Sequence, residues 1–411
     1  MSARVCDLGS LMPVDEAIRR LLDQAPPPPP GQMIDLDQAL GRVLACDIHS
    51  PVNLPAWDNS AMDGYALRAA DLPAEGGWLP LGGRIAAGDQ ACSPLLAQQT
   101  VQIFTGAPLP SGADTVVPQE RCQVEGERVC FPAVSPGDHV RKLGEEVRRG
   151  DLLLQAGKRL RAQEVGLLAG AGIARVEVYR PLQVCLLSSG NELREPGEAL
   201  APGQIYNSNR HCLAALLRGW GVEVHDYGVM ADELAASRHA LSLASSECDL
   251  LLSSGGVSVG GEDHLKQAIE ELGRIDFWRL AIQPGKPLAF GDVAGKPWIG
   301  MPGNPSAALI TALVVVRPLL LRAQGVTEVL PLPLSVPAGF DWLQRNKRRQ
   351  YLRARLIPGT DGQLRVELHP QQSSAMLTAA CWADGLAVIE CEQQVLKHDN
   401  VMFLSFADLM H

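Results

Sequence analysis

The spacing of hydrophobic and polar positions changes along the chain, and these changes predict its elements. Near the N-terminus we expect two short amphipathic helices, the first of them capped by Asp15. The apolar face of the first consists of Ala17, Ile18, Leu21 and Leu22, and that of the second of Leu36, Leu40, Val43 and Leu44. Between them, the prolines at 26–30 predict a stiff extended spacer.

From residue 51 to about residue 150 the apolar runs become short and are interrupted by Gly and Pro. This texture predicts a β-rich unit. Its strands include the runs TVQIFTG (100–106), DTVVPQE (114–120) and RVCFPAV (128–134). A helical pattern over residues 162–171 separates this unit from the next one.

Between residues 181 and 324 a strand, a Gly-rich loop and a helix follow one another repeatedly. Several strands are continuous apolar runs, as expected for a sheet that is covered on both faces. The expected strands are QVCLLSS (183–189), GVEVHDYGV (221–229), CDLLLSS (248–254), RLAIQ (279–283), PLAFG (287–291) and KPWIGM (296–301), with helices over 210–218, 233–244 and 265–272. This is the pattern of a doubly wound α/β domain, in which ligands bind beyond the carboxyl ends of the strands.

The C-terminal part returns to short strands with polar interruptions. The runs YLRARL (351–356), QLRVEL (363–368), GLAVIE (385–390) and VMFLSF (401–406) suggest a small β-barrel or sandwich. The longest apolar stretch, Ala307 to Leu321, contains Arg317 and Pro318 and is shorter than the roughly 20 residues of a membrane span. We therefore expect a soluble, multidomain α/β plus β protein.

Composition narrows the function classes. The chain has 411 residues, of which 46% are hydrophobic and 20% charged, as in a globular protein of more than one domain. Its net charge is −10 without a long basic block, which disfavours nucleic-acid binding but leaves an anionic small-molecule substrate open. The ten cysteines form no C-x-x-C pair, and the N-terminus has no apolar signal segment. Reduced thiols in the cytoplasm are expected.

The most informative loop is the segment 253–263, between the strand CDLLL and a helix. Its glycines allow a ligand to approach the backbone closely, and successive amides can bind an anion. The residues expected to bind substrate here are Ser254, Gly255, Gly256 and Ser258. Asp263 stands where the helix should start, either as a helix cap or as a ligand of metal or substrate.

Two further loops end strands of the same region and are also candidates for substrate binding. The first consists of Pro284, Gly285 and Lys286, and the second includes Gly303, Asn304 and Ser306. The rigid turn suits a Lys286 that grips phosphate, although a surface lysine would fit the same pattern. Asn304 can cap a helix whose free N–H groups attract an anion, and a helix start without a ligand fits equally well.

Acidic residues follow several of these strands. Glu192 and Asp232 come after two strands, and Asp263 ends the Gly-rich loop. If these carboxylates converge at one rim, they repel one another unless a cation lies among them. Oxygen ligands alone indicate a hard cation, so Mg2+ is the predicted metal.

Together these loops resemble the molybdopterin molybdenumtransferase family, the MoeA-type enzymes related to the C-terminal domain of gephyrin. The matching segments, in family order, are PAWDNSAMDGYA, FTGAPLPSGADTVVPQE, SSGNEL, GQIYNSNR, SSGGVSVGGEDH, QPGKPLAFG, MPGNPSA and PQQSSAML. Any one of them is a weak signal, but the ordered set is specific and spans nearly the whole chain.

The resemblance implies four domains and an elongated homodimer with a site between subunits. The implied domains are a helical linker domain in two segments (1–50 and 150–180), a β-rich lobe (51–149), a molybdopterin-binding α/β domain (181–325) and a C-terminal β domain (326–411). The implied reaction takes adenylylated molybdopterin and molybdate, releases AMP with the help of Mg2+ and leaves molybdenum on the dithiolene. Other cofactor-assembly proteins are possible partners; nucleic acid and membrane are not expected.

Residue roles follow from the same resemblance. The implied catalytic residues are Asp63, Thr105, Glu192 and Lys286, and the implied metal ligands are Glu192, Asp232, Asp263 and Glu146. Asp63 is assigned to molybdate or metal handling. Three positions depart from the family pattern, because Glu146 and Asn191 stand where the family often has Asp, and Gln283 where it often has Lys.

Alternatives from other function classes stay open. The fold could serve as a non-catalytic molybdopterin-binding scaffold, or the chain could be a molybdopterin adenylyltransferase. The intact acidic and Lys positions argue against a scaffold. An adenylyltransferase would need neither the AMDGYA lobe nor the C-terminal β domain. A homologue adapted to tungstate fits the sequence as well.

Overall fold

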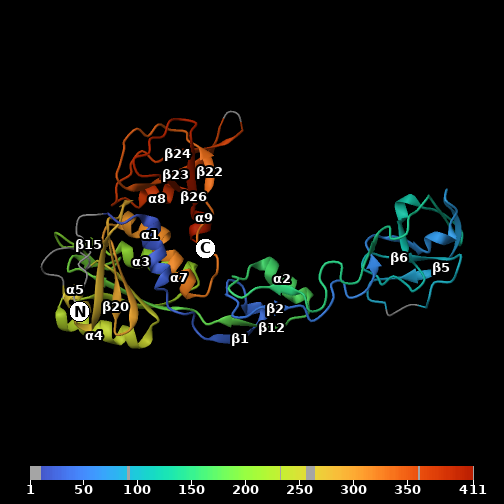
Figure 1. The fold of residues 1–411 in the computed structure, drawn as a ribbon, viewed down its shortest axis with the longest axis horizontal. Coiled ribbons are helices and arrows are strands. Elements are labelled where there is room, and N and C mark those ends of the chain that lie inside the picture. Colours follow the sequence, from blue (N-terminus) through green and yellow to red (C-terminus); the bar gives the residue numbers. More distant parts are fainter. Residues whose placement is uncertain (1–10, 90–92, 232, 256–263, 360–361, 411) are drawn as a thin grey trace. The chain divides into compact units, whose positions relative to one another are not determined.

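The computed structural model describes residues 11–410 except 90–92, 232, 256–263 and 360–361 (Figure 1). The chain forms two compact units. Unit 1 comprises Met1–Gln32, Gly41–Val43 and Tyr179–His411, and unit 2 comprises Met33–Leu40 and Leu44–Val178. The finer division into five segments remains a prediction.

A six-stranded sheet forms the α/β part of unit 1, in the order β16–β13–β17–β21–β20–β18. Its strands are β13 (Gln183–Ser189), β16 (Glu223–Met230), β17 (Leu250–Ser254), β18 (Gly273–Arg279), β20 (Pro287–Val293) and β21 (Lys296–Met301). The first four in this order are parallel, whereas β20 and β18 are antiparallel to their neighbours. After β13 the chain adds β16 on one side and β17 on the other, so the carboxyl ends of β13 and β17 form a topological switch point.

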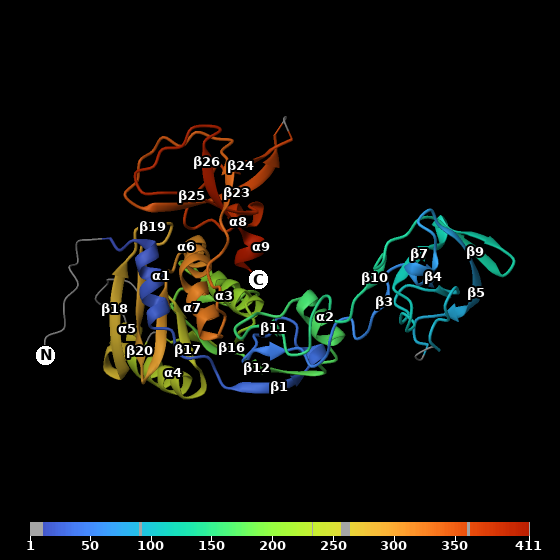
Figure 2. The ribbon, with the colours of Figure 1, turned by 45° about the vertical axis from the view of Figure 1, so that its right-hand side comes forward.

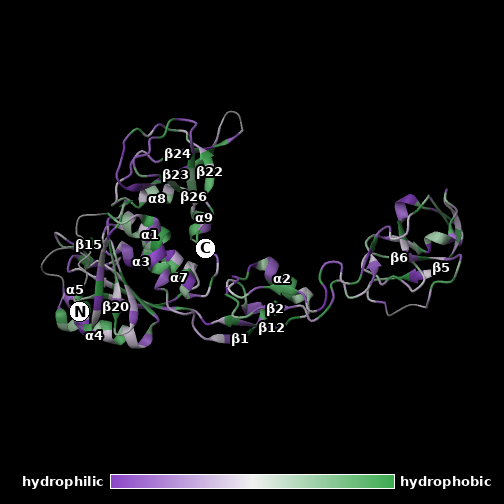
Figure 3. Ribbon diagram, viewed as in Figure 1, coloured by the Kyte–Doolittle hydropathy of each residue, from purple (hydrophilic) through white to green (hydrophobic). Residues whose placement is uncertain are grey.

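Helices cover both faces of this sheet (Figure 2). One face packs against α1 (Val14–Asp23), α3 (Ser208–Gly219), α6 (Pro305–Thr311) and α7 (Arg317–Ala323), and the other against α4 (Leu234–Glu247) and α5 (His264–Leu272). Strand β13 supplies both cores by alternation, with Val184 and Leu186 in the first and Cys185 and Leu187 in the second. Figure 3 colours the covering helices in both hydrophobic and hydrophilic shades, as expected for helices with one buried face.

The longest apolar stretch forms one helical segment in the core. A π-helical turn, Ala312–Val316, joins α6 to α7. Residues Pro305–Ala323 are long and apolar enough to cross a membrane, but 94% of that window is buried inside the protein. Arg317 lies within it and donates hydrogen bonds to the carbonyls of Val329 (3.2 Å) and Asp408 (2.8 Å). The segment is therefore a core helix.

The C-terminal part of unit 1 is a second six-stranded sheet, ordered β19–β23–β25–β26–β22 with β24 beside β23. Its strands are β19 (Ile282–Gln283), β22 (Leu334–Pro337), β23 (Arg349–Pro358), β24 (Leu364–Leu368), β25 (Gly385–Ile389) and β26 (Asn400–Ser405), with the short helices α8 (Thr378–Trp382) and α9 (Phe406–Leu409). A bridge between Ala338 and Val366 brings the β22 and β24 ends together, so the sheet curls. The predicted β-rich character is confirmed, and the barrel remains a prediction.

Unit 2 carries the third six-stranded sheet, in the order β7–β4–β6–β5–β9–β8. Its strands are β4 (Gly64–Leu67), β5 (Gly77–Ile85), β6 (Thr100–Ile103), β7 (Thr115–Pro118), β8 (Gln123–Glu125) and β9 (Arg128–Phe131). Two-stranded pairs join β2 (Ile48–His49) to β11 (Leu152–Leu154) and β3 (Asn59–Ser60) to β10 (Val140–Arg141). The predicted helix is α2 (Ala162–Gly170), and β1 (Gly31–Asp35) pairs with β12 (Arg175–Tyr179) where the chain passes between the units.

Three expectations were wrong. The first helix begins after Pro13, so Asp15 lies in its first turn instead of capping it. The second amphipathic helix does not form, since the segment contains only a 3-10 turn at Leu36–Gln38. The run RLAIQ is divided between two sheets, because Arg279 ends β18 of the α/β sheet, whereas Ile282 and Gln283 form β19, which pairs with β23 in the C-terminal sheet.

Candidate functional site

The switch point of the α/β sheet collects the loops after three strands. An added Cβ at Gly255, after β17, would lie 2.7 Å from the carbonyl oxygen of Ser189 at the end of β13. Asn209 of α3 joins the loops after β17 and β21, because its side-chain amide donates to Ser254 Oγ (3.0 Å) and to the carbonyl of Gly303 (2.8 Å). The predicted substrate-binding residues Ser254, Gly255 and Gly303 are thus brought together.

Several buried polar atoms at this rim have no hydrogen-bond partner among the described residues. They are Ser188 Oγ, Asn209 Oδ1, Ser306 Oγ and Thr311 Oγ1. Because a buried polar group without a partner costs free energy of about 1–3 kcal/mol, such a group in a native protein calls for an explanation. They lie in β13, α3 and α6, the elements that surround the switch point.

The turn that carries Lys286 packs against α6 at Ala307 and Thr311. The backbone N–H of Leu280 donates to the carbonyl of Lys286 (2.9 Å) and closes the turn. Gly285 has a φ of +101°, and an added Cβ there would lie 2.6 Å from Thr311 Oγ1, so this position requires glycine. Pro284 is buried and Lys286 is exposed. The turn therefore carries an exposed lysine beside α6.

The helix start itself is met by a loop of the C-terminal sheet domain. The N–H of Ser306 donates to the carbonyl of Ser374 (3.0 Å), and the Asn304 amide lies 3.4 Å from Ser374 Oγ. Asn304 precedes α6 as its cap residue, with Pro305 in the first turn, but its side chain makes no capping hydrogen bond. The segment that follows β24 therefore borders the predicted site at α6.

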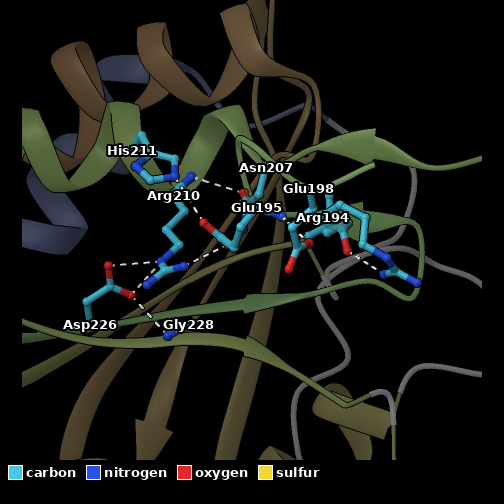
Figure 4. Close-up of polar contacts among 9 residues, drawn as sticks. Arg194, Glu195, Glu198, Asn207, Arg210, His211, Asp226 and Gly228 are labelled. Atoms are coloured by element: carbon cyan, nitrogen blue, oxygen red, sulfur yellow. Dashed lines mark hydrogen bonds and ion pairs between the residues drawn. The ribbon is translucent and has the colours of Figure 1, made fainter. Parts of the chain in front are cut away.

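Beside the end of β13, a cluster of charged residues fixes the segment that follows (Figure 4). The guanidinium of Arg210 binds Glu195 (2.7 Å) and Asp226 (2.8 Å), and His211 lies 3.1 Å from Glu195. The hydrogen bond to Asp226 is the main cause that raises the pKa of Arg210. The parallel pair β14 (Leu193–Arg194) and β15 (Ile205–Tyr206) lies in the same segment.

Glu192 lies within this segment and is exposed. Its carboxylate lies over Gly190, where an added Cβ would be 2.6 Å from the nearer carboxylate oxygen. The backbone N–H of Ile205 donates to the carbonyl of Glu192 (2.9 Å). The Glu192 carboxylate therefore lies next to Gly190, the residue after β13.

In unit 2, Asp63 and Thr105 form a pair. Asp63 Oδ1 accepts hydrogen bonds from the Thr105 N–H (2.8 Å) and from Thr105 Oγ1 (2.7 Å). These bonds, the backbone one first, hold the pKa of the Asp63 carboxyl below its usual value. Both residues are exposed at the ends of loops that flank β4 and β6. The pair presents a fixed carboxylate to solvent.

The remaining candidate in unit 2 is Glu146, which follows a second polar pair along the chain. The Lys142 ammonium binds Asp58 (2.9 Å), and the N–H of Leu143 also donates to Asp58 (2.8 Å). Glu146, four residues after Lys142, is exposed, and its backbone N–H donates to the carbonyl of Leu54 (2.9 Å). Lys142 is thus already paired with an acid.

The predicted metal ligands are only partly described. Asp232 and Asp263 lie outside the described residues, as do Gly256 and Ser258 of the Gly-rich loop. Glu192 belongs to unit 1 and Glu146 to unit 2. Within the part of the chain that the structure describes, no group of three or more His, Cys, Asp or Glu side chains could hold a metal ion. The Mg2+ site therefore remains a prediction.

The motifs GQIYNSNR and PQQSSAML contain residues at this site for which the sequence predicted no role. Asn209 and Arg210 belong to the first motif and Ser374 to the second. Asn209 is 8% exposed, and its amide joins two loops. The adjacent polar residues Asn209 and Arg210 at the start of α3 are the feature of the sequence that could have predicted these contacts.

The comparisons with known proteins agree with this geometry. The family descriptions that match are the MoeA N-terminal region (domain I and II) at residues 12–172, a probable molybdopterin binding domain at 185–322 and the MoeA C-terminal region (domain IV) at 335–405. A Haemophilus influenzae protein named molybdopterin molybdenumtransferase is 37% identical over 386 residues, which cover 93% of this chain and 95% of that protein. The chain belongs to the molybdopterin molybdenumtransferase family.

Other members of the molybdopterin molybdenumtransferase family extend the likeness. A Nostoc protein of that name is 38% identical over 306 residues, covering 72% of this chain and 70% of the relative. The crystal structure of a molybdopterin biosynthesis MoeA protein from Pyrococcus horikoshii superposes with a TM-score of 0.82 at 26% identity, covering 97% of this chain and all (100%) of that one. The family inferred from the ordered motifs, and the multidomain α/β plus β fold class, are confirmed.

Proposed function

We propose that this chain is an enzyme of molybdenum-cofactor biosynthesis that transfers molybdenum to molybdopterin. The observation that carries the proposal is the convergence of Ser254, Gly255 and Gly303 at the switch point, where Asn209 joins Ser254 to Gly303. Ligands of open α/β sheets bind at such a switch point. Membership of a family whose relatives bear the name molybdopterin molybdenumtransferase supports the same conclusion.

The anionic part of the substrate would lie at the turn of Lys286 and at the start of α6. Lys286 suits phosphate because it is an exposed cation, and the helix dipole at the start of α6 favours an anion. On this proposal the substrate is adenylylated molybdopterin, and Lys286 supports the departing AMP by stabilising its negative charge.

The remaining predicted groups complete the proposal. Asp63, held by Thr105, would act on molybdate, and Glu192 would help to hold Mg2+ with Asp232, Asp263 and Glu146. When bound, Mg2+ would offset the repulsion between two anionic reactants. Unit 2 supplies Asp63. We propose a homodimer in which residues from two copies complete the site. We also propose a cytoplasmic location.

An assay that follows AMP tests the proposed function. The purified chain is incubated anaerobically with adenylylated molybdopterin, molybdate and Mg2+, and both AMP and protein-bound molybdenum are measured. AMP release that depends on molybdate, with equal molybdenum incorporation, is the expected result. In a parallel incubation with ATP and molybdopterin, adenylyl transfer would instead identify an adenylyltransferase. Binding of molybdopterin without any turnover would identify a scaffold. Replacing molybdate by tungstate in the same assay compares the two oxyanions.

A further inference from the structure

The side chain of Arg210 joins the segment that follows β13 to strand β16 (Figure 4). Arg210 lies in the first turn of α3, where its backbone N–H donates to the side chain of Asn207 (3.2 Å). Its guanidinium binds the carboxylate of Glu195, in the segment after β13, at 2.7 Å and that of Asp226, in β16, at 2.8 Å. The Arg210 side chain is 21% exposed, so both ion pairs are partly shielded from solvent. One cation therefore connects two segments that α3 separates along the chain.

The bond to Glu195 holds the backbone that carries Glu192. These two residues lie before and after the short strand β14, with Glu192 directly preceding it and Glu195 directly following it. β14 pairs with β15, and the N–H of Ile205 at the start of β15 donates to the carbonyl of Glu192 (2.9 Å). Glu192 therefore belongs to a small pair of strands that Arg210 attaches to α3.

The bond to Asp226 holds a bulge in β16. The pairing of β13 with β16 shifts between Leu186 and Ser188, where β16 has one residue more than β13. Gly228 lies in this bulge with a φ of +70°, and its N–H donates to the Asp226 carboxylate (3.0 Å). The Arg210 guanidinium lies beside Gly228, since an added Cβ there would be 3.9 Å from it. Because a bulge redirects the strand that contains it, this contact fixes the direction in which the chain leaves β16.

The carboxylate of Glu192 is available to an external ligand. It is exposed, and among the described residues it forms no hydrogen bond or ion pair. Carboxylate oxygens are the ligands that Mg2+ and Mn2+ prefer. The surroundings of Glu192 therefore fit a group that binds a divalent cation.

We propose that Arg210 is a positioning residue, which places Glu192 to bind a divalent cation by fixing strand β14 and the bulge in β16. This inference rests on the proposed function in that Glu192 is taken as a ligand of Mg2+. Arg210 cannot be a ligand itself, because a guanidinium has no acceptor atom. Residues that orient a metal ligand typically change metal affinity by about 10- to 100-fold when they are replaced.

Arginine suits this role for a geometric reason. Its Nε donates to both oxygens of Asp226 (2.8 and 2.9 Å), whereas Nη1 binds Glu195, so the planar guanidinium engages the two carboxylates at different positions. A lysine would keep the charge, but its single ammonium does not reproduce this fork. Charge and position also predict opposite effects. Removal of a cation near a metal site strengthens metal binding by electrostatics alone, whereas loss of positioning weakens it.

Binding of Mn2+ to the full-length chain tests the inference. The dissociation constant is measured from the electron paramagnetic resonance signal of free Mn2+ for the wild type, Arg210→Gln and Arg210→Lys. The matched control is Arg180→Gln, because Arg180 binds Asp249 through two contacts (2.8 and 2.7 Å) at the amino ends of β13 and β17, the opposite end of the same sheet. Hydrogen exchange of peptides over residues 190–207 reports on the β14–β15 pair, and circular dichroism melts identify any unfolded variant.

We expect Arg210→Gln to weaken Mn2+ binding about tenfold and to speed up hydrogen exchange over residues 190–207. Arg210→Lys should lose most of the affinity as well, since it keeps the charge without the fork, and Arg180→Gln should bind Mn2+ like the wild type. In the AMP assay, Arg210→Gln should raise the Mg2+ concentration for half-maximal rate more than it lowers kcat at saturating Mg2+. Unchanged or tighter Mn2+ binding in Arg210→Gln, an equal loss in Arg180→Gln, or no binding to the wild type would each overturn the inference.

The two proposals fail separately in these experiments. If the wild type releases no AMP, but Arg210→Gln loses Mn2+ affinity and Arg180→Gln does not, the proposed function is wrong and Arg210 remains a positioning residue. If the wild type turns over and Arg210→Gln binds Mn2+ and responds to Mg2+ like the wild type, the function holds and the role of Arg210 is rejected.

Discussion

At the scale of single residues, the pair of Asp63 and Thr105 offers the most direct test of chemistry in unit 2. Asp63 is exposed, and two hydrogen bonds from Thr105 fix its orientation. We expect Asp63→Asn to abolish molybdenum insertion without changing the melting temperature, because the amide keeps the size of the side chain but loses the charge. Molybdenum content after turnover and a circular dichroism melt measure the two effects. Retained insertion would refute the role given to Asp63.

Thr105 should control the protonation of Asp63. The Thr105 N–H and hydroxyl both lower the pKa of the Asp63 carboxyl, so the carboxylate stays charged to lower pH than an ordinary Asp. Thr105→Val removes only the hydroxyl donor, which raises that pKa towards its usual value. The acidic limb of the pH–activity profile should therefore move to higher pH in Thr105→Val. Thr105→Ser keeps the hydroxyl and should leave the limb in place; the same displacement in both variants would contradict the explanation.

Residue-scale reasoning from sequence succeeded where the backbone itself determines the residue. Gly285 and Gly255 were predicted from their loops, and both have positive φ and close contacts that exclude a Cβ. The backbone gives no such reason for Asn209. Its role depends on a contact with Gly303, which is 94 positions away along the chain. Such a contact comes from the fold.

At the scale of elements, apolar spacing predicted the strands well and one helix wrongly. The predicted helical face at 36–44 would bury Leu40, yet Leu40 is 67% exposed. Leu44 belongs to a core of unit 2, whereas Val43 belongs to a core of unit 1. Gly41, with a φ of +76°, precedes both and has a backbone conformation that does not occur within a helix. The helical spacing was therefore coincidental, because residues that serve two separate cores cannot share one helix face.

The first helix is tied to the C-terminal sheet by an ion pair whose pH dependence can be predicted. Asp15, in the first turn of α1, binds Arg349 through two contacts of 2.7 and 2.8 Å. The hydrogen bond from Arg349 is the main cause that lowers the pKa of Asp15 below 3.8. A carboxyl with a lowered pKa stabilises the fold above its unfolded-state pKa, and this contribution disappears as the pH falls through the lowered value.

We therefore expect Asp15→Asn to reduce the free energy of unfolding by about 1 kcal/mol at pH 7, from the ion pair and the helix dipole together. The difference from the wild type should vanish in strong acid, below the lowered pKa. Denaturant titrations over a pH series measure it. Asp23→Asn is the control, since Asp23 is at the end of α1 and pairs only with the exposed Arg19. A loss as large in the control would assign the effect to general surface charge.

At the scale of the whole molecule, the ordered motifs identified the family. The division of the chain into two units, in contrast, follows from its separate hydrophobic cores. Among the described residues, each hydrophobic cluster belongs to a single unit. Residues 33–40 join unit 2, although the segments before and after them belong to unit 1. Composition does not change at these crossings, so the sequence alone gave no sign of them. Units with separate cores are expected to unfold as separate cooperative blocks.

This organisation predicts two calorimetric transitions that can be moved independently. Phe131 lies in a core of unit 2 and Phe403 in a core of unit 1, and both are almost completely buried. Replacing either by Ala removes about 3–5 kcal/mol from its own unit, which should lower one transition by on the order of 10 °C. Phe131→Ala should leave the transition of unit 1 unchanged, and Phe403→Ala that of unit 2. Molybdopterin, which we propose binds at the switch point, should raise the unit 1 transition in both variants. If both substitutions lowered a single common transition, the two units would be one cooperative block, and the assignment of separate cores would fail.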